Sequence, residues 1–466
     1  MAVGDCKLGF AASAKTAKNP GGRLSQTFNQ PVGKLSFSRN YIYIWPQSDL
    51  HLADMKSAEI HPRFIQGQLI EALADSPVVL IHGPRQCGKT TLALGVGAQT
   101  GHSYISFDDE TQRASAVADP QGFVADLPAK VILDEVQRVP DIFTSIKAAV
   151  DKNRQPGRFI FTGSSNVLLL PKLADSLAGR MEILRLHPLS QTEHSGKPSR
   201  FLTTLFEAGF KAKKQTRLGK TLADIIVAGG YPAALARSTE KRRAIWYRDY
   251  IETLLQRDIR DLARISALDA LPRLMTLAAG QTARLLNVAD LAAPFHLSRP
   301  TIREYITLLE RIFLLEELPP WHSNRLSRLI KTPKLHLADT GLACALLGID
   351  ANTLWSQRDL LGQLLETFVY QELRRQASWH PEPIHFHHFR DKDGVEVDIV
   401  LESGRKIAGI EIKASATATS ADFKSLRKLQ EATGKNFAGG VVLYDGEALT
   451  TFGNNLYAVP VSALWN

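Results

Sequence analysis

The sequence predicts an α/β protein with three parts: a parallel sheet covered by helices, a helical middle region, and a second α/β domain at the C-terminal end. Three observations lead to this prediction. Short apolar runs alternate with helix-compatible segments between residues 78 and 186, which favours parallel strands joined by helices. From Leu285 onward the pattern changes to two short amphipathic helices. After Gly394 apolar and polar residues alternate with a period of two, which is typical of strands.

Five strands are expected in the first α/β domain. They are Val78–His82, Tyr104–Phe107, Val131–Asp134, Arg158–Thr162 and Ile183–Leu186. Ligands of open parallel sheets bind at the carboxyl ends of the strands. We therefore expect the turns that follow these strands to form one site.

A glycine-rich loop with the pattern G-x-x-x-x-G-K-T follows the first strand. The loop and the start of the next helix comprise Gly83, Pro84, Arg85, Gln86, Cys87, Gly88, Lys89, Thr90 and Thr91. The glycines let backbone N–H groups turn toward phosphate oxygens, and the helix offers its positive end to the same anion. In such loops the lysine reaches the β- and γ-phosphates and the hydroxyl binds Mg²⁺. The loop therefore predicts a site for ATP and Mg²⁺, with Lys89 and Thr90 in these roles.

The third strand ends in two acids. We expect Asp134 to hold Mg²⁺ through a water molecule and Glu135 to polarise the attacking water. A surface glycine turn followed by an acid-ended strand is the alternative, but here both motifs occur in the expected order. The sequence thus favours ATP hydrolysis.

Two further groups can contribute to this site. The turn of residues 162–165 can present a hydroxyl to the γ-phosphate or the lytic water, or it can cap a helix. Arg180 can stabilise charge on the transferring phosphoryl group, in its own chain or in a neighbouring subunit, or it can form a surface ion pair. Both alternatives stay open, and a homo-oligomer is compatible with the second role.

The residues from Leu285 to Leu318 predict a helix-turn-helix followed by an apolar strand, as in a winged helix. Ser298 is placed to cap the second helix. Basic side chains that can contact DNA phosphates are Arg299, Arg303, Arg325, Arg328 and Lys331. Packing beside the first domain is the alternative to DNA binding.

Four charged residues are expected to gather in the C-terminal part. Glu366 lies on a predicted helix, Asp398 on one strand, and Glu411 with Lys413 on the next. A hairpin of the two strands brings their charged side chains to one face. Such carboxylates can hold Mg²⁺, and a nearby lysine can orient or deprotonate water for phosphodiester attack. The alternative is an ion pair on an exposed strand face.

These motifs resemble two known families. The segments Gly83–Thr90, Leu133–Gln137, Phe161–Ser165 and Leu177–Arg180 are similar to AAA-type ATP-binding proteins of bacteria and archaea, which join a P-loop ATPase to a C-terminal domain of unknown function. Asp398, Glu411 and Lys413, with Glu366, resemble the PD-(D/E)XK nuclease superfamily. The resemblance implies ATP binding, ATP hydrolysis and a restriction-endonuclease-like domain. It leaves nuclease activity open.

These inferences divide the chain of 466 residues into five parts. They are 1–54, a disordered extension; 55–195, the P-loop AAA-type ATPase domain; 196–280, a helical region; 281–345, the winged-helix region; and 346–466, the nuclease-like α/β domain. We predict an Mg²⁺-dependent ATPase whose nucleotide state controls the C-terminal domain. The alternative is a nucleotide-gated DNA-binding or protein-interaction switch without nuclease activity.

Composition bears on the partners and the compartment. The net charge of +9 makes nucleic acid a plausible partner, although solvated surfaces carry similar charge. Three cysteines without disulfide or metal-ligand spacing fit a reducing cytoplasm. No run approaches the length of a membrane span. We therefore expect a cytoplasmic protein with no membrane contact.

Overall fold

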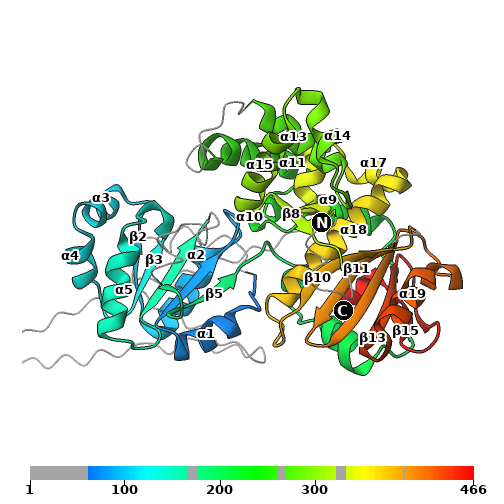
Figure 1. The fold of residues 1–466 in the computed structure, drawn as a ribbon, viewed down its shortest axis with the longest axis horizontal. Coiled ribbons are helices and arrows are strands. Elements are labelled where there is room, and N and C mark those ends of the chain that lie inside the picture. Colours follow the sequence, from blue (N-terminus) through cyan, green and yellow to red (C-terminus); the bar gives the residue numbers. More distant parts are fainter. Residues whose placement is uncertain (1–60, 165–176, 260–268, 322–331, 392–393) are drawn as a thin grey trace, which may run out of the picture. The chain divides into compact units, whose positions relative to one another are not determined.

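The computed structural model describes residues 61–164, 177–259, 269–321, 332–391 and 394–466 (Figure 1). The predicted extension 1–54 and the basic residues Arg325, Arg328 and Lys331 lie outside the described residues. All described residues belong to one compact unit of the chain. Within them, the helices are too short or too polar to cross a membrane.

A five-stranded parallel sheet forms the first domain, as predicted. Its strands are β1 (Val78–His82), β2 (Ser103–Ser106), β3 (Val131–Asp134), β4 (Phe159–Gly163) and β5 (Met181–Arg185). Their order in the sheet is β2-β3-β4-β1-β5, so β1 lies between β4 and β5. This order places the turn after β1 beside the turn after β4, with β3 next to them.

Helices cover both faces of this sheet. They are α1 (Gln66–Asp75), α2 (Lys89–Thr100), α3 (Glu110–Ala118), α4 (Pro120–Ala125) and α5 (Ile142–Lys152). Val78 and Leu80 of β1 belong to the core with α5, whereas Val79 and Ile81 belong to the core with α1 and α2. Successive side chains of a strand point to opposite faces, so a fully apolar strand is buried on both. The apolar sequence of β1 thus reflects its position in a sheet that lies between two layers of helices.

The middle of the chain is mainly helical. Its helices are α7 (Gln191–Ser195), α8 (Phe201–Thr203), α9 (Lys220–Ala228), α10 (Pro232–Leu235), α11 (Glu240–Thr253), α13 (Ala270–Gly280), α14 (Val288–Ala292), α15 (Arg299–Arg311), α16 (Thr340–Leu347) and α17 (Ala351–Ser356). The Ser298 side chain accepts a hydrogen bond from the Thr301 N–H at 3.2 Å and caps α15, as predicted. The pair α14 and α15 matches the expected helix-turn-helix segment.

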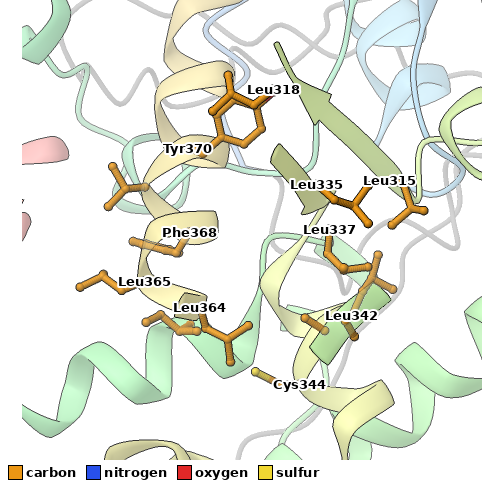
Figure 2. Close-up of a cluster of buried hydrophobic side chains, with 14 of the residues drawn as sticks. Leu315, Leu318, Leu335, Leu337, Leu342, Cys344, Leu364, Leu365, Phe368 and Tyr370 are labelled. Atoms are coloured by element: carbon orange, nitrogen blue, oxygen red, sulfur yellow. The ribbon is translucent and has the colours of Figure 1, made fainter. Parts of the chain in front are cut away.

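A small antiparallel sheet follows these two helices. It contains β7 (Arg284–Leu285), β8 (Leu315–Leu318) and β9 (Lys334–Leu337), in the order β7-β9-β8. Figure 2 shows leucines of β8 and β9 facing one apolar core together with α16 and the helix that contains Phe368. Because β9 is paired on both sides and packed on this core, its position is firmly set. The assignment as a winged helix stays a prediction.

The C-terminal domain is built on a mixed sheet. Its elements are α18 (Arg358–Ala377), β10 (His385–Arg390), β11 (Glu396–Ser403), β12 (Lys406–Lys413), α19 (Lys424–Thr433), β13 (Phe437–Tyr444), β14 (Ala448–Thr451) and β15 (Leu456–Pro460). The sheet order is β10-β11-β12-β13-β15-β14-β6, where β6 (Lys213–Lys214) comes from the middle region. The predicted hairpin of β11 and β12 is present. The edge strand β6 was not predicted from the sequence.

Candidate functional site

The phosphate-binding loop leaves β1 in a conformation that requires glycine. A Cβ on Gly83 would lie 2.0 Å from the carbonyl oxygen of Leu186, which is closer than any side chain can come. Gly88 has φ +101°, a left-handed conformation, and immediately precedes α2. The two glycines therefore bring the chain from a buried strand to the N-terminus of a helix within one short loop. This end of α2 carries N–H groups without acceptors inside the helix, which suits a phosphate.

The Lys89 side chain folds back onto this loop. Its side chain is 5% exposed, and its Nζ donates hydrogen bonds to the carbonyl oxygens of Gly83 at 3.0 Å and Pro84 at 2.9 Å. These acceptors are neutral, whereas a phosphate oxygen is charged and forms a stronger bond with an ammonium group. The donor set of the loop therefore fits a polyphosphate.

The structure brings the two predicted metal ligands together. The Thr90 hydroxyl donates to Asp134 Oδ1 at 2.9 Å, although the residues are 44 positions apart. The Tyr104 hydroxyl donates to Asp134 Oδ2 at 3.0 Å, and the Thr162 hydroxyl donates to Oδ1. Mg²⁺ prefers oxygen ligands of this kind. The chemistry of the residues thus fits a nucleotide-bound magnesium ion, and the sequence interpretation missed Tyr104.

Tyr104 is held in its neutral form. Burial, and then the negative charge of Asp134, raise the pKa of its phenol above the ordinary value. A neutral phenol can donate to the carboxylate, which fixes the orientation of Asp134.

Glu135, the carboxylate that is expected to polarise the attacking water, has an unusual backbone conformation. Its φ is +56°, which is rare for a residue with a side chain. Its Oε2 accepts hydrogen bonds from the Ser164 hydroxyl at 3.0 Å and from the Gln137 amide. Its N–H donates to the Thr162 hydroxyl at 3.2 Å. The hydroxyls of Thr162 and Ser164 therefore contact the two acids, and both interpretations of this turn stay predictions; Ser165 lies outside the described residues.

Arg63 supports the loop from behind. Its guanidinium donates to the carbonyl oxygens of Cys87 and His187, each at 2.6 Å, and to Glu193 Oε1 at 2.9 Å. The Cys87 thiol faces the protein interior, where it donates to the Leu186 carbonyl at 3.5 Å, and burial raises its pKa. A thiol of this kind is unreactive. No motif in the sequence indicates Arg63.

Arg180 is not brought to the loop of its own chain. It precedes β5, whose first residue Met181 pairs with Val78 at the start of β1, so it lies at the amino ends of the strands. Its guanidinium forms two hydrogen bonds with Asp151, at 2.6 and 3.0 Å. Lys89 and Asp134 lie at the opposite, carboxyl ends. This position disagrees with a role on the nucleotide of the same chain and leaves a role in a neighbouring subunit as a prediction.

The four charged residues of the C-terminal domain lie in one cluster, but two unexpected residues join them. Lys334 Nζ lies 2.7 Å from Glu366 Oε1, 3.5 Å from Asp398 Oδ1 and 2.6 Å from Glu396 Oε1. The Lys334 side chain is 2% exposed. We call Lys334, Glu366, Glu396, Asp398, Glu411 and Lys413 the acidic cluster. The sequence interpretation missed Lys334 and Glu396.

The remaining residues of the acidic cluster pair with each other. Lys413 Nζ lies 2.8 Å from Glu411 Oε1, and the Ser425 hydroxyl donates to Glu411 Oε2 at 3.0 Å. Burial, and then the charge of Asp398, raise the pKa of Glu411 to about 7. Among the described residues, no group of three or more histidine, cysteine or acidic side chains is arranged to hold a metal ion.

Family models match three parts of the chain. An AAA domain matches residues 75–195, a domain of unknown function (DUF8612) matches residues 219–353, and another (DUF4143) matches residues 361–464. The AAA match covers the phosphate-binding loop, the acids Asp134 and Glu135, and Arg180. The acidic cluster is divided between the two domains of unknown function, because Lys334 belongs to the first and the other members to the second.

Two relatives span most of the chain. They are the uncharacterized protein Mb2031c of Mycobacterium bovis and the uncharacterized protein Rv2008c of Mycobacterium tuberculosis. Each is 30% identical over 407 residues, which are 87% of this chain and 85% of the relative.

Two solved structures show a weaker likeness. The Walker-type ATPase PABY2304 of Pyrococcus abyssi is 15% identical, with a TM-score of 0.37, and the match covers 62% of this chain and 99% of that one. The RuvB Holliday junction branch migration motor of Thermotoga maritima is 17% identical, with a TM-score of 0.24, over 55% of this chain and 89% of that one.

Proposed function

The chain belongs to the same family as the two uncharacterized mycobacterial proteins, and we propose that it is an Mg²⁺-dependent ATPase whose nucleotide state controls its C-terminal domain. The AAA domain supports the first half of this proposal. The observation that carries it is the contact of Thr90 with Asp134, at 2.9 Å, directly beside the phosphate-binding loop. In this contact the two oxygens that P-loop enzymes use around Mg²⁺ already lie together.

The expected chemistry follows from these positions. A Mg²⁺ ion held near Thr90 and Asp134 would supply positive charge to offset the charge of the nucleotide phosphates. We expect Lys89 to exchange its loop carbonyls for phosphate oxygens, and Thr90 and Asp134 to turn toward the metal. Glu135 is expected to orient the attacking water, with its carboxylate fixed by Ser164.

Hydrogen bonds connect the loop to the segment after β5, and that segment to α18, which supports the proposed control of the C-terminal domain. Arg63 joins the Cys87 carbonyl of the loop to the His187 carbonyl, in the segment that follows β5. Two positions farther along, the Leu189 carbonyl accepts a hydrogen bond at 2.8 Å from Arg375 of α18. α18 also carries Glu366 of the acidic cluster. A change at the loop that moves this segment would therefore act on the helix of the cluster.

A buried charge network strengthens this connection. Arg375 pairs with Asp339 at 2.9 Å and with Glu372 at 3.0 Å, and all three side chains are at most 3% exposed. Glu372 also accepts a hydrogen bond from the Gln191 N–H at 2.9 Å. Removing one member of such a network leaves an uncompensated buried charge. We therefore expect α18 to move together with the segment that follows β5.

The first experiment tests ATP binding and turnover. Lys89→Ala is expected to lose tight ATP binding in calorimetry, whereas Glu135→Gln should bind ATP normally and release phosphate slowly. Lys152→Ala, at an exposed position of the same domain, serves as the matched control and should behave like the wild type. Unchanged turnover in both Lys89→Ala and Glu135→Gln would end the ATPase assignment.

A second candidate function is a nucleotide-gated switch that binds DNA or protein without cleaving DNA. The ammonium of Lys334 among the acids favours this candidate over a nuclease. ATP turnover should be measured with and without single- and double-stranded DNA, together with Mg²⁺-dependent cleavage by the wild type and Asp398→Ala. DNA-stimulated turnover without cleavage supports the switch, whereas cleavage that Asp398→Ala abolishes supports the nuclease.

Cellular context and assembly are part of the same proposal. The two described cysteines, Cys87 and Cys344, are free and buried, which is compatible with a reducing cytoplasm. If Arg180 acts on a neighbouring subunit, the active form is an oligomer. A mixture of inactive Arg180→Ala and inactive Lys89→Ala proteins would then regain turnover, because the mixed assembly contains intact sites.

A further inference from the structure

We propose that Lys334 is the resident cation of the acidic cluster and holds the place that a divalent metal would take in a nuclease, so the cluster is closed to Mg²⁺ while β9 is in place. This inference goes beyond the ATPase activity and does not depend on it. It also disagrees with the metal site that the nuclease resemblance implies.

The geometry of the ammonium group leaves no place for a metal. The Lys334 Nζ lies 2.6 Å from Glu396 and 2.7 Å from Glu366, so it sits between carboxylates of β11 and α18. Asp398, the expected metal ligand of β11, lies 3.5 Å from the same nitrogen. Mg²⁺ needs carboxylate oxygens at about 2.0–2.1 Å around one point. That point is filled by the lysine.

The fold holds this lysine in place. Leu335 and Leu337 of β9 face the apolar core of Figure 2, and by strand alternation Lys334 and His336 share the other face. The His336 ring contacts the Thr367 hydroxyl of α18 at 3.1 Å, one residue from Glu366. β9 is also the central strand of its sheet, with β7 on one side and β8 on the other. A register shift of β9 would disrupt all of these contacts.

The two lysines of the acidic cluster lie against its four carboxylates. Burial by itself lowers the pKa of Lys334, but the attraction of Glu366, Asp398 and Glu396 outweighs it and raises the pKa above the ordinary value. The lysine therefore keeps its positive charge. Lys413, the residue expected to activate water, is paired with Glu411 at 2.8 Å. Each lysine is thus already paired with carboxylates of the cluster, so neither is left for nuclease chemistry.

The Lys334 ammonium group therefore belongs to one part of the chain and is bound by acids of the next part. Lys334 lies in the part that matches DUF8612, whereas Glu366, Glu396 and Asp398 lie in the part that matches DUF4143. The ammonium thus joins the two parts in the way that a shared metal joins two chains. A divalent ion can enter only if β9 leaves or if the lysine is removed.

Mn²⁺ titration of the full chain without nucleotide tests this inference, with free Mn²⁺ followed by electron paramagnetic resonance. The wild type and Asp398→Asn should give the same isotherm, because the cluster binds no metal in either. Lys334→Met should gain one saturable Mn²⁺ site, which the double variant Lys334→Met/Asp398→Asn lacks. Lys413→Met is the matched control: it also removes a lysine of the cluster, but it leaves Lys334 in place and should gain no site.

Thermal unfolding gives a second readout. Without metal the Lys334→Met protein should melt several degrees below the wild type, and Mn²⁺ should restore part of this loss in the variant only. A wild-type site that disappears in Asp398→Asn would overturn the inference, and so would a folded Lys334→Met protein that binds no additional Mn²⁺. If Lys334→Met does not fold, the comparison of wild type with Asp398→Asn decides alone. None of these results depends on ATP binding, so they are distinct from a failure of the ATPase assignment.

Discussion

The phosphate-binding site and the acidic cluster use the same residue types but differ in what their acids contact. Asp134 accepts hydrogen bonds from the hydroxyls of Thr90, Tyr104 and Thr162, which are neutral groups. Asp398 instead lies beside the ammonium of Lys334. A metal can add its charge to the first site, whereas in the second it must displace a charge that is already bound. We infer that the partner of a carboxylate, and not its presence alone, decides whether each of these sites takes Mg²⁺.

The largest expected effect concerns the acid of the first site. Glu135→Gln should lower ATP turnover by about 1000-fold, because the amide cannot polarise the water, while ATP binding is unchanged. Steady-state phosphate release and calorimetry measure the two quantities. Glu110→Gln, an exposed acid of the same domain, is the control and should keep full turnover. Turnover of Glu135→Gln within twofold of the wild type would contradict the role of Glu135 in ATP hydrolysis.

The next effect concerns the buried lysine of the second site. Lys334→Met should lower the free energy of unfolding by about 3–5 kcal/mol, because it leaves buried carboxylates without a counter-ion. Lys413→Met should cost only about 0–1 kcal/mol, since its side chain is 35% exposed. Urea unfolding of both variants measures this difference. Equal losses would show that Lys334 is not the main counter-ion of the cluster.

The stability of the C-terminal domain should also depend on pH through Glu411. Its pKa is raised from 4.5 to about 7 in the folded protein, so the folded state holds a proton that the unfolded state has released. Stability from this group is therefore present at low pH and is lost as the pH rises from about 4.5 to about 7. In the Glu411→Gln variant, the fall in the free energy of unfolding over this pH range should be about 2 kcal/mol smaller than in the wild type. Urea midpoints at pH 5 and pH 8 measure it, and the same pH dependence in variant and wild type would contradict it.

A smaller effect is expected from the residue that orients Glu135. Ser164→Ala removes the hydroxyl that donates to the Glu135 carboxylate at 3.0 Å. We expect turnover to fall about 10-fold with little change in ATP affinity, because one hydrogen bond to a charged group contributes about 1.5 kcal/mol. A loss of ATP binding instead would mean that Ser164 acts on the nucleotide directly.

The sequence predicted that Thr90 and Asp134 lie together because the motifs that contain them are local. Gly83 to Thr90 are contiguous, and Asp134 and Glu135 end an apolar strand, so the rule that parallel strands share a ligand edge was sufficient to bring them together. Tyr104 was missed because in the sequence it looks like any strand residue. Its contact with Asp134 depends on the pairing of β2 with β3.

The second site could be predicted only in part. The hairpin of β11 and β12 followed from strand alternation, and it located Asp398 and Glu411 correctly. Lys334 lies 32 residues from Glu366 and is on a strand of the small sheet, whereas Glu366 is on α18, so no spacing rule connects them. Its apolar neighbours in β9 indicate a buried strand, and a lysine in a buried strand needs a partner. That was the one signal in the sequence, and it does not identify the partner.

The stoichiometry of Mn²⁺ binding tests the central contrast most directly. Electron paramagnetic resonance of the full chain, with and without a non-hydrolysable ATP analogue, counts bound metal in the wild type, Asp134→Asn and Asp398→Asn proteins. We predict one Mn²⁺ per chain that depends on the nucleotide, is lost in Asp134→Asn and is unchanged in Asp398→Asn. A bound Mn²⁺ that persists without nucleotide and disappears in Asp398→Asn would contradict the account.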